Sequence, residues 1–351
     1  MRSDRRTILL TGASGVLGRA LVDELVSDFT LLCLRRRTPI DDPRVVEIPG
    51  DLSARRLGLD ATTWRDLCRR VDVIVHSAAT TSWRARRPEV IAVNVTGTGQ
   101  MVELADRAGA PLYHLSTAFV SRRSSAENDR DDDDRAGGVA AYLESKHAAE
   151  ALIRKADIGA VIVRPSIVIG DSRDGRIAAF QGIYRVLAAV YQGLLPVLPA
   201  EPDARIDFVP QDVVARAVGR LVREQIRDDV FWLTAGPEAL SVDELVLLTL
   251  EAAERAGPRP SPPRMVAKEA VHRLLLPLLD DVMPVALRRQ FSAFSEFMLL
   301  FQSDEAVPSC LGRLGLGDEA DHATLRSAFT ASVEYWAAQN QTPATSQEAV
   351  G

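Results

Sequence analysis

Cysteine is scarce in this sequence, which has only Cys33, Cys68 and Cys310 among its 351 residues. Their odd number and wide spacing exclude a disulfide framework and a cysteine-based metal site. We therefore expect reduced thiols and no bound metal. The chain also lacks the apolar segment of a signal peptide after its charged first residues, so we expect a cytoplasmic protein.

The sequence also lacks a strong excess of one charge and an unbroken hydrophobic run. Its 42 basic and 48 acidic residues give a net charge of -6, which excludes the electrostatic signature of a nucleic-acid-binding protein. The longest apolar region, 177–199, is interrupted by Gln181, Arg185, Gln192 and Pro196. Its apolar positions recur at helical spacing, so we expect a partly buried helix and no transmembrane segment. Peripheral contact with a membrane remains open.

Short apolar segments alternate with helical patterns along the first half of the chain, which is typical of a parallel sheet. The sequence predicts an α/β fold: a Rossmann-type doubly wound sheet with a smaller, mainly helical C-terminal substrate lobe. We expect the Rossmann domain at 1–235, the substrate lobe at 236–336 and a disordered tail at 337–351. The predicted strands are 7–12, 30–35, 45–50, 71–79, 110–120 and 159–170.

Three glycines, Gly12, Gly15 and Gly18, stand at three-residue intervals between the first strand and the first helix. Glycine permits a tight turn, a close approach of the backbone to a ligand and close helix packing. We predict that a pyrophosphate lies over the first N–H groups of this helix. The alternative is a plain strand-to-helix turn with a glycine cap. The expected contacts are Gly12, Ser14, Gly15, Val16, Leu17 and Gly18.

A second motif places Tyr142 and Lys146 four residues apart, on one face of a predicted helix. An ammonium beside a phenol favours the tyrosinate and lowers the phenol pKa from its usual ~10, which suits acid–base chemistry. Two unrelated surface residues would show the same spacing. Ser116 and Thr117 end the strand at 112–120, where α/β sheets bind ligands, and their hydroxyls suit a substrate carbonyl. They could equally satisfy backbone groups there.

Seven segments resemble the extended short-chain dehydrogenase/reductases and follow the order found in that family. They are residues 11–18, 50–52, 76–79, 94–98, 115–120, 142–146 and 164–170. The resemblance implies a nicotinamide cofactor and catalysis by Thr117, Tyr142 and Lys146, with Asn94 opening a helix near the site. It also implies cofactor contacts by Asp51, Leu52, Ala78, Ala79, Asn94, Ser116, Tyr142, Lys146, Pro165, Ser166 and Ile167.

The branch within that superfamily is indicated by two segments. Ala118 and Phe119 stand where the nucleotide-sugar dehydratases have two carboxylates. Residues 163–190 resemble the thioester reductases, which include the fatty acyl-CoA reductases of lipid metabolism. This implies an NADPH-dependent reductase of an acyl thioester, held on CoA or on a carrier protein, that forms an aldehyde or alcohol. A nucleotide-sugar epimerase, an alcohol dehydrogenase and a non-enzymatic NADP-sensing protein are the alternatives.

The second strand ends in Arg35, Arg36 and Arg37, where an enzyme that prefers NAD would place an acid. Guanidinium groups suit a phosphate. We therefore predict NADP(H) as the cofactor, with Arg35 as the first contact of the 2′-phosphate and Arg36 as the next. A basic surface turn is the alternative.

The C-terminal third predicts a helix with Ser241 as its N-cap and Gly257 just past its end. Apolar helical faces follow at 271–283 and 287–301. Capping an acyl pocket, forming a homodimer and touching a membrane surface are all compatible with them. The acidic segment 122–138 is predicted to be a solvated loop or a lid over the substrate entrance.

Overall fold

The computed structural model describes residues 5–82, 85–121, 138–267, 270, 301–303 and 305–340. The predicted acidic loop, apart from residue 138, lies outside the described residues. The same holds for most of the two predicted apolar helical faces and for the tail from 341 onward.

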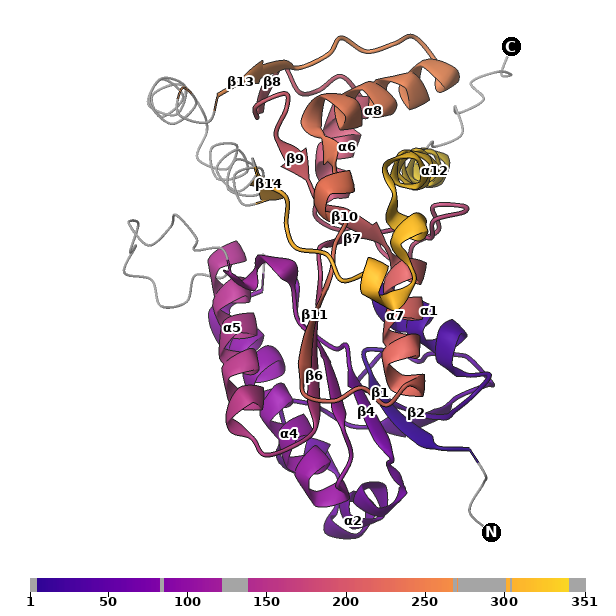
Figure 1. The fold of residues 1–351 in the computed structure, drawn as a ribbon, viewed down its shortest axis with the longest axis vertical. Helices are drawn as coiled ribbons and strands as arrows, with labels where there is room; N and C mark the ends of the chain where they lie inside the picture. Colours follow the sequence, from indigo (N-terminus) through magenta and orange to yellow (C-terminus); the bar gives the residue numbers. More distant parts are fainter. Residues whose placement is uncertain are drawn as a thin grey trace, which may run out of the picture.

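Seven parallel strands form the sheet of the larger lobe, in the order β11-β6-β5-β4-β1-β2-β3 (Figure 1). They are β1 (Thr7–Thr11), β2 (Thr30–Arg35), β3 (Val46–Pro49), β4 (Val73–His76), β5 (Leu112–Leu115), β6 (Ala160–Pro165) and β11 (Asp229–Leu233). The strand order reverses between β1 and β4, which is the switch point where open α/β sheets bind ligands. The predicted Rossmann-type fold is confirmed.

The central strands are apolar along their whole length because helices cover both faces of the sheet. In β1, Ile8 and Leu10 belong to one core cluster and Leu9 to the other, as the two-residue period of a strand requires. Helices α2, α4 and α5 cover one face, and α1 and α7 cover the other (Figure 1). Their bounds are α1 Val16–Leu25, α2 Ala61–Arg70, α4 Gly97–Ala108, α5 Val139–Lys155 and α7 Gln211–Arg223.

A smaller lobe lies beyond the carboxyl ends of the strands, at the top of Figure 1. It takes residues from two stretches of the chain, 167–210 and the described residues between 236 and 340, so the lobes do not divide at residue 235 as predicted. Its helices are α6 (Ile183–Tyr191), α8 (Val242–Ala256) and α12 (His322–Asn340). Its short strands are β7 (Ile167–Ile169), β8 (Val197–Pro199), β9 (Arg205–Ile206), β10 (Phe208–Pro210), β12 (Leu240–Ser241), β13 (Arg264–Val266) and β14 (Gln302–Ser303).

Several local predictions are refined by the structure. The strand predicted at 110–120 ends at Leu115, because a single helical turn forms at Ala118–Ser121. Helix α12 continues through Asn340, four residues into the predicted tail. The cap at Ser241 is confirmed: its hydroxyl accepts a hydrogen bond from the N–H of Glu244.

The apolar region at 177–199 contains the nine-residue helix α6 instead of one long helix. In the part of the chain that the structure describes, no helix is long and apolar enough to cross a membrane.

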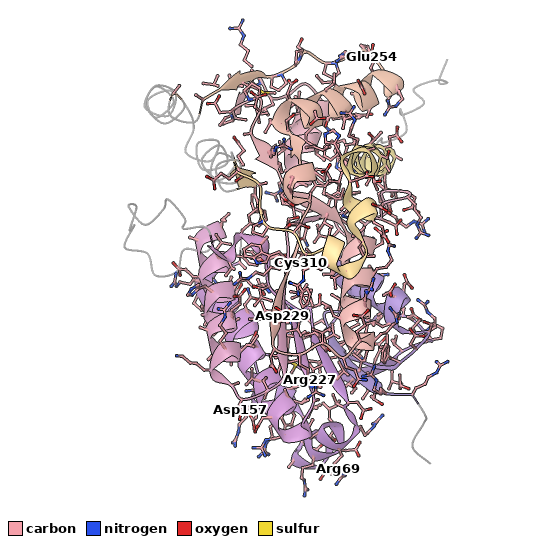
Figure 2. All side chains as sticks on the ribbon, in the orientation of Figure 1. Arg69, Asp157, Arg227, Asp229, Glu254 and Cys310 are labelled. Atoms are coloured by element: carbon pink, nitrogen blue, oxygen red, sulfur yellow. The ribbon has the colours of Figure 1, made fainter. Side chains whose placement is uncertain are left out.

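The two lobes meet near Cys310, whose backbone N–H donates to the carbonyl oxygen of Trp232 in β11 at 2.8 Å (Figure 2). All three cysteines are free, as the sequence predicted. Burial raises the pKa of the Cys33 thiol to about 12, so this thiol is unreactive near neutral pH.

Candidate active site

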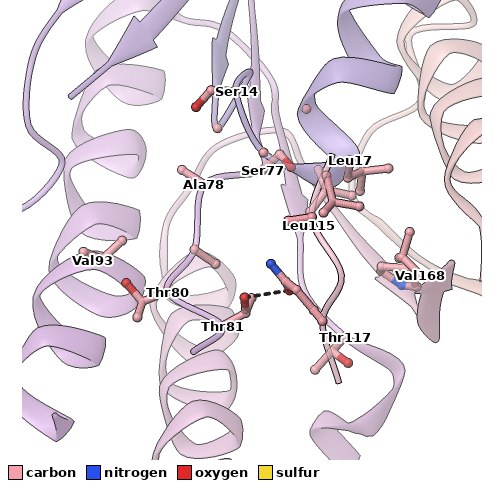
Figure 3. Close-up of a pocket in the computed structure, with 18 of the residues that line it drawn as sticks. Ser14, Leu17, Ser77, Ala78, Thr80, Thr81, Val93, Leu115, Thr117 and Val168 are labelled. Atoms are coloured by element: carbon pink, nitrogen blue, oxygen red, sulfur yellow. Dashed lines mark hydrogen bonds between the residues drawn. The ribbon is translucent and has the colours of Figure 1, made fainter. Parts of the chain in front are cut away.

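A cavity of about 590 Å³ opens between the two lobes at the carboxyl ends of the strands. Figure 3 shows it between the first loop, the segment after β4 and the end of β5. Of the predicted site residues, all except Asn94 line this cavity. They are Gly12, Ser14, Gly15, Val16, Leu17, Gly18, Arg35, Arg36, Asp51, Leu52, Ala78, Ala79, Ser116, Thr117, Tyr142, Lys146, Pro165, Ser166 and Ile167.

The first loop needs glycine for two steric reasons. Gly12 has φ +78°, and a Cβ atom there would lie 2.7 Å from the backbone nitrogen of Ala78. A Cβ atom on Gly18 would overlap the carbonyl oxygen of Gly12, so this glycine lets α1 pack against the turn. Among the described residues, no side chain caps the start of α1 at Gly15. The helix therefore presents uncapped N–H groups to the cavity, as a pyrophosphate site requires.

The end of β5 is bonded to helix α5 through three consecutive residues. The Lys146 ammonium donates to the carbonyl oxygen of Leu115 at 2.7 Å. The Ser116 hydroxyl donates to Glu150 at 2.6 Å, and the Thr117 hydroxyl is hydrogen-bonded to the Tyr142 phenol. The structure thus brings the three predicted catalytic side chains together, and it directs the Ser116 hydroxyl to a carboxylate.

Burial dominates the protonation of the catalytic pair. It lowers the pKa of Lys146 to about 8, against the opposing charge of Glu150. It raises the pKa of Tyr142 to about 12, against the hydrogen bond from Thr117. This direction is opposite to the one predicted from the neighbouring ammonium, because burial of the phenol outweighs the hydrogen bond from Thr117. In the protein alone, Tyr142 is protonated near neutral pH.

Asn94 lies behind the cavity wall. It belongs to a π-helical turn, Ala92–Thr96, that continues from α3 (Arg87–Ile91), so it does not open the helix as predicted. Its side-chain amide donates to the Ser145 hydroxyl at 2.9 Å and to the Thr80 carbonyl oxygen at 3.1 Å. The side-chain oxygen Oδ1 of Asn94 accepts a hydrogen bond from the Thr80 N–H at 2.7 Å. Asn94 therefore ties the segment after β4 to α5.

The three arginines at the end of β2 differ in their partners. Arg35 forms an ion pair with Glu47 of β3. The pKa of Asp51 is lowered first by hydrogen bonds from Ser53 and then by the charges of Arg36 and Arg37. The latter two arginines therefore lie close to the predicted adenine side of the cavity.

Sequence reasoning missed part of the substrate side of the cavity. Phe119 and Phe301 contact each other edge to face, with ring centroids 4.4 Å apart, and both line the cavity. Thr81 donates to the side-chain oxygen of Gln181 at 3.2 Å, across 100 residues of sequence (Figure 3). Phe301 ends an apolar stretch that the sequence placed near the substrate, but nothing in the sequence indicated its partner.

The nicotinamide region offers a second test of whether a dinucleotide fits. Ser166 is 6% exposed and lines the cavity, and its hydroxyl has no hydrogen-bond partner among the described residues. A buried unpaired hydroxyl costs free energy unless a ligand or water satisfies it. The glycine loop, the uncapped helix and this hydroxyl together fit a nicotinamide dinucleotide.

A Rossmann sheet with this loop and with adjoining Thr, Tyr and Lys side chains defines an NAD(P)-dependent oxidoreductase of the extended short-chain dehydrogenase/reductase type. Within that class, the sequence model of the family described as "Male sterility protein" matches residues 36–218, more than half of the chain. The chain belongs to this family, in the thioester-reductase branch that the sequence indicated. The predicted cofactor, NADP(H), agrees with this membership.

Two much longer proteins are similar to the chain. Fusarin C synthetase of Gibberella moniliformis is 29% identical over 257 residues, which cover 68% of this chain and 6% of the synthetase. A glycine betaine reductase of Emericella nidulans is 27% identical over 275 residues, which cover 68% of this chain and 22% of the reductase. The chain thus spans a small part of these relatives.

Solved structures agree on the fold. The terminal R domain of the myxalamid PKS-NRPS biosynthetic pathway is 25% identical, with a TM-score of 0.71 and 95% of this chain and 92% of that one covered. A UDP-N-acetylglucosamine 4-epimerase of Methanobrevibacter ruminantium is 14% identical, with a TM-score of 0.65 and coverage of 96% and 100%. The second likeness concerns the fold alone.

Proposed function

We propose that this protein is an NADPH-dependent reductase of an acyl thioester, with the acyl group held on CoA or on a carrier protein. The observation that carries the proposal is the apolar wall beside Thr117 and Tyr142. This wall is formed by Phe119, Ile167, Ile177, Ala179, Ile183 and Phe301. An acyl chain gains free energy by burial there, whereas the side chains of this wall offer no hydrogen-bond partner to the hydroxyls of a sugar. The similarity to a protein named as a glycine betaine reductase supports a reductase.

When bound, the dihydronicotinamide supplies the hydride for the carbonyl carbon of the thioester. Tyr142 donates a hydrogen bond to the carbonyl oxygen and then its proton to the oxyanion that develops. Thr117, whose hydroxyl already reaches the same phenol, rotates to supply a second donor. Because burial keeps Tyr142 protonated near neutral pH, the residue is prepared to act as an acid, as reduction requires.

Reduction of the carbonyl carbon gives a thiohemiacetal. Its carbon–sulfur bond breaks as the hydroxyl proton leaves, which releases a thiol and an aldehyde. A second hydride, from a second NADPH that replaces the NADP⁺, and a proton from Tyr142 would convert the aldehyde to the alcohol.

Lys146 holds the cofactor side of the site. One of its three N–H groups is directed to the carbonyl of Leu115, which leaves donors for the nicotinamide ribose. With a pKa of about 8, it is largely an ammonium at pH 7. We place the protein in the cytoplasm, where its free thiols would stay reduced.

The experiment that tests this function follows NADPH oxidation with acetyl-, octanoyl- and palmitoyl-CoA and with the matching acyl-carrier conjugates. Nucleotide sugars and secondary alcohols are offered with NADP⁺ in parallel, and products are identified directly. Reduction of a thioester supports the proposal. Turnover of only a sugar nucleotide or an alcohol would replace it with the epimerase or dehydrogenase alternative, and cofactor binding without any turnover would favour a sensor.

A further inference from the structure

Glu150 is a buried carboxylate one helical turn beyond Lys146 on α5, and the reaction described above does not use it. It is 1% exposed. The Arg164 guanidinium donates to both of its oxygens, at 2.9 Å from Nε and 2.6 Å from Nη2. The Ser116 hydroxyl and Arg154 add further hydrogen bonds, each at 2.6 Å. A charge buried this deeply is tolerated only with such a set of partners.

These contacts extend a regular pattern between β5 and α5. Leu115, Ser116 and Thr117 are consecutive, and they bond to Lys146, Glu150 and Tyr142 respectively. The three helical residues are spaced by four, so they lie on one face of α5, one turn apart. Glu150 is the last of the three connections.

Arg164 anchors this connection to the rest of the sheet. It lies on β6, next to β5, and its guanidinium stacks over the ring of Trp232 in β11 at 4.7 Å from the centroid. Pro165 and Ser166, which line the cavity, follow it directly. Glu150 therefore joins the catalytic helix to the strand ends that form the cavity floor.

We propose that Glu150 is the positioning residue of this site: through Ser116 it fixes the strand end that carries Thr117, and through its charge it holds Lys146 as an ammonium. The proposal rests on the function proposed above. In the proposed reaction Glu150 touches neither the substrate nor the cofactor, so it acts through its neighbours.

The titratable groups around Lys146 show how the charge of Glu150 affects the Lys146 pKa. On its own helix, Lys146 faces Tyr142 and Glu150. From β4 and β5 it faces His76 and His114, whose pKa values are lowered, to about 3 for His76, by burial first and then by the charge of Lys146. Both imidazoles are therefore neutral, and the carboxylate of Glu150 is the charge that opposes the effect of burial on the Lys146 pKa. Without it, no charge among the described residues would oppose the effect of burial, and the Lys146 pKa would fall further.

Three variants separate the effect of the Glu150 charge from the effects of its side-chain length and of general changes in the fold. Glu150→Gln keeps the shape but removes the charge, whereas Glu150→Asp keeps the charge but shortens the reach to Ser116. Arg154→Ala is the matched control, since it removes a half-exposed partner and leaves the Arg164 and Ser116 contacts in place. Thermal unfolding of each variant establishes that it is folded at the temperature used.

The decisive measurement is the titration of Lys146 itself, which needs no substrate. It is practical because the chain has only three lysines, Lys146, Lys155 and Lys268. NMR of protein labelled in its lysine side chains follows the Lys146 titration directly, with Lys155→Arg and Lys268→Arg used for assignment. We expect a midpoint near 8 in the natural sequence. In Glu150→Gln it should fall by about one pH unit, the effect of losing one nearby opposite charge. It should not fall in Glu150→Asp or Arg154→Ala.

Turnover gives the second readout. We expect Glu150→Asp to lower kcat roughly ten- to hundredfold, as a small misplacement of catalytic groups does, with little change in KM for NADPH. In Glu150→Gln, the alkaline limb of the pH profile should move to lower pH together with the Lys146 midpoint. An unchanged Lys146 midpoint in folded Glu150→Gln, or unchanged kcat in Glu150→Asp, would overturn the proposal. If no thioester is reduced by the natural sequence, the proposed function fails, while the NMR titration still decides the role of the Glu150 charge.

Discussion

The guanidinium Nε of Arg35 lies 2.6 Å from a carboxylate oxygen of Glu47. The other oxygen of Glu47 accepts hydrogen bonds from the backbone N–H groups of Ile40 and Asp41, at 3.0 and 3.2 Å. Glu47 thus holds both ends of the turn that carries the arginines. The arginine that the sequence ranked first for the 2′-phosphate is already neutralised by a neighbour, which leaves Arg36 as the stronger candidate.

We expect Arg36→Ala to lower kcat/KM for NADPH by roughly ten- to a hundredfold, the value of one charge-assisted hydrogen bond. The value for NADH should change little, because NADH has no 2′-phosphate. Arg35→Ala is the comparison and should lower kcat/KM for NADPH less, since Arg35 is already paired with Glu47. Steady-state kinetics with both cofactors measure this, and an equal loss with NADPH and NADH would contradict it.

Tyr142→Phe should lower turnover by roughly a hundred- to ten-thousandfold, because it removes the general acid. Phenylalanine keeps the ring that packs against Leu143 and Phe119, so the fold and the affinity for NADPH should be retained. Single-turnover kinetics and cofactor titration separate the two effects. Normal turnover in this variant would show that another group donates the proton.

Acyl chain length should change the apparent affinity in steps. Each methylene buried against the apolar wall adds up to ~0.8 kcal/mol, or about fourfold in KM, until the chain reaches the end of the cavity. Phe301→Ala should move that limit to longer chains, because it removes a ring that closes the wall against Phe119. A series of acyl-CoAs measured with both proteins tests this. The same length preference in both would place the acyl chain elsewhere.

Stability should fall on the acid side because of two buried histidines. The pKa of His76 is lowered to about 3 and that of His114 well below its usual value, chiefly by burial. Above pH ~6.5 both histidines are neutral in the folded and in the unfolded chain, so they do not change the free energy of unfolding with pH. Below that value the unfolded chain binds protons that the folded chain refuses, so each histidine reduces stability by up to about 1.4 kcal/mol per pH unit.

His114 allows this effect to be isolated. Neither of its ring nitrogens has a hydrogen-bond partner in the part of the chain that the structure describes. His114→Leu should therefore keep the fold and reduce the loss of stability between pH 7 and pH 5, as measured by urea unfolding. An unchanged pH dependence would mean that His114 accepts its proton in the folded protein.

The sequence predicted the parts of the site that depend on local spacing. Gly12 and Gly18 are fixed by one strand–turn–helix unit, and Tyr142 and Lys146 by one helical turn. The remaining features join residues that are far apart in the chain, such as Phe119 with Phe301. The hydrogen bond from the Ser116 hydroxyl to Glu150 could not be predicted either, because it depends on how α5 packs against β5. The direction of the Tyr142 pKa shift was wrong for the same reason: burial depends on the whole fold.

The division of the smaller lobe between two stretches of the chain limits how this enzyme can be recombined. Strand β9, from the first stretch, pairs antiparallel with β12 and β14 from the second, and β8, also from the first stretch, pairs parallel with β13 from the second. A chimera joined only at residue 235 would combine half of one lobe with half of another and break both sheets. A chimera that exchanges the whole smaller lobe needs three junctions between the two sequences, after β6, before α7 and after β11. Residues 167–210 and 236–340 are then transferred together.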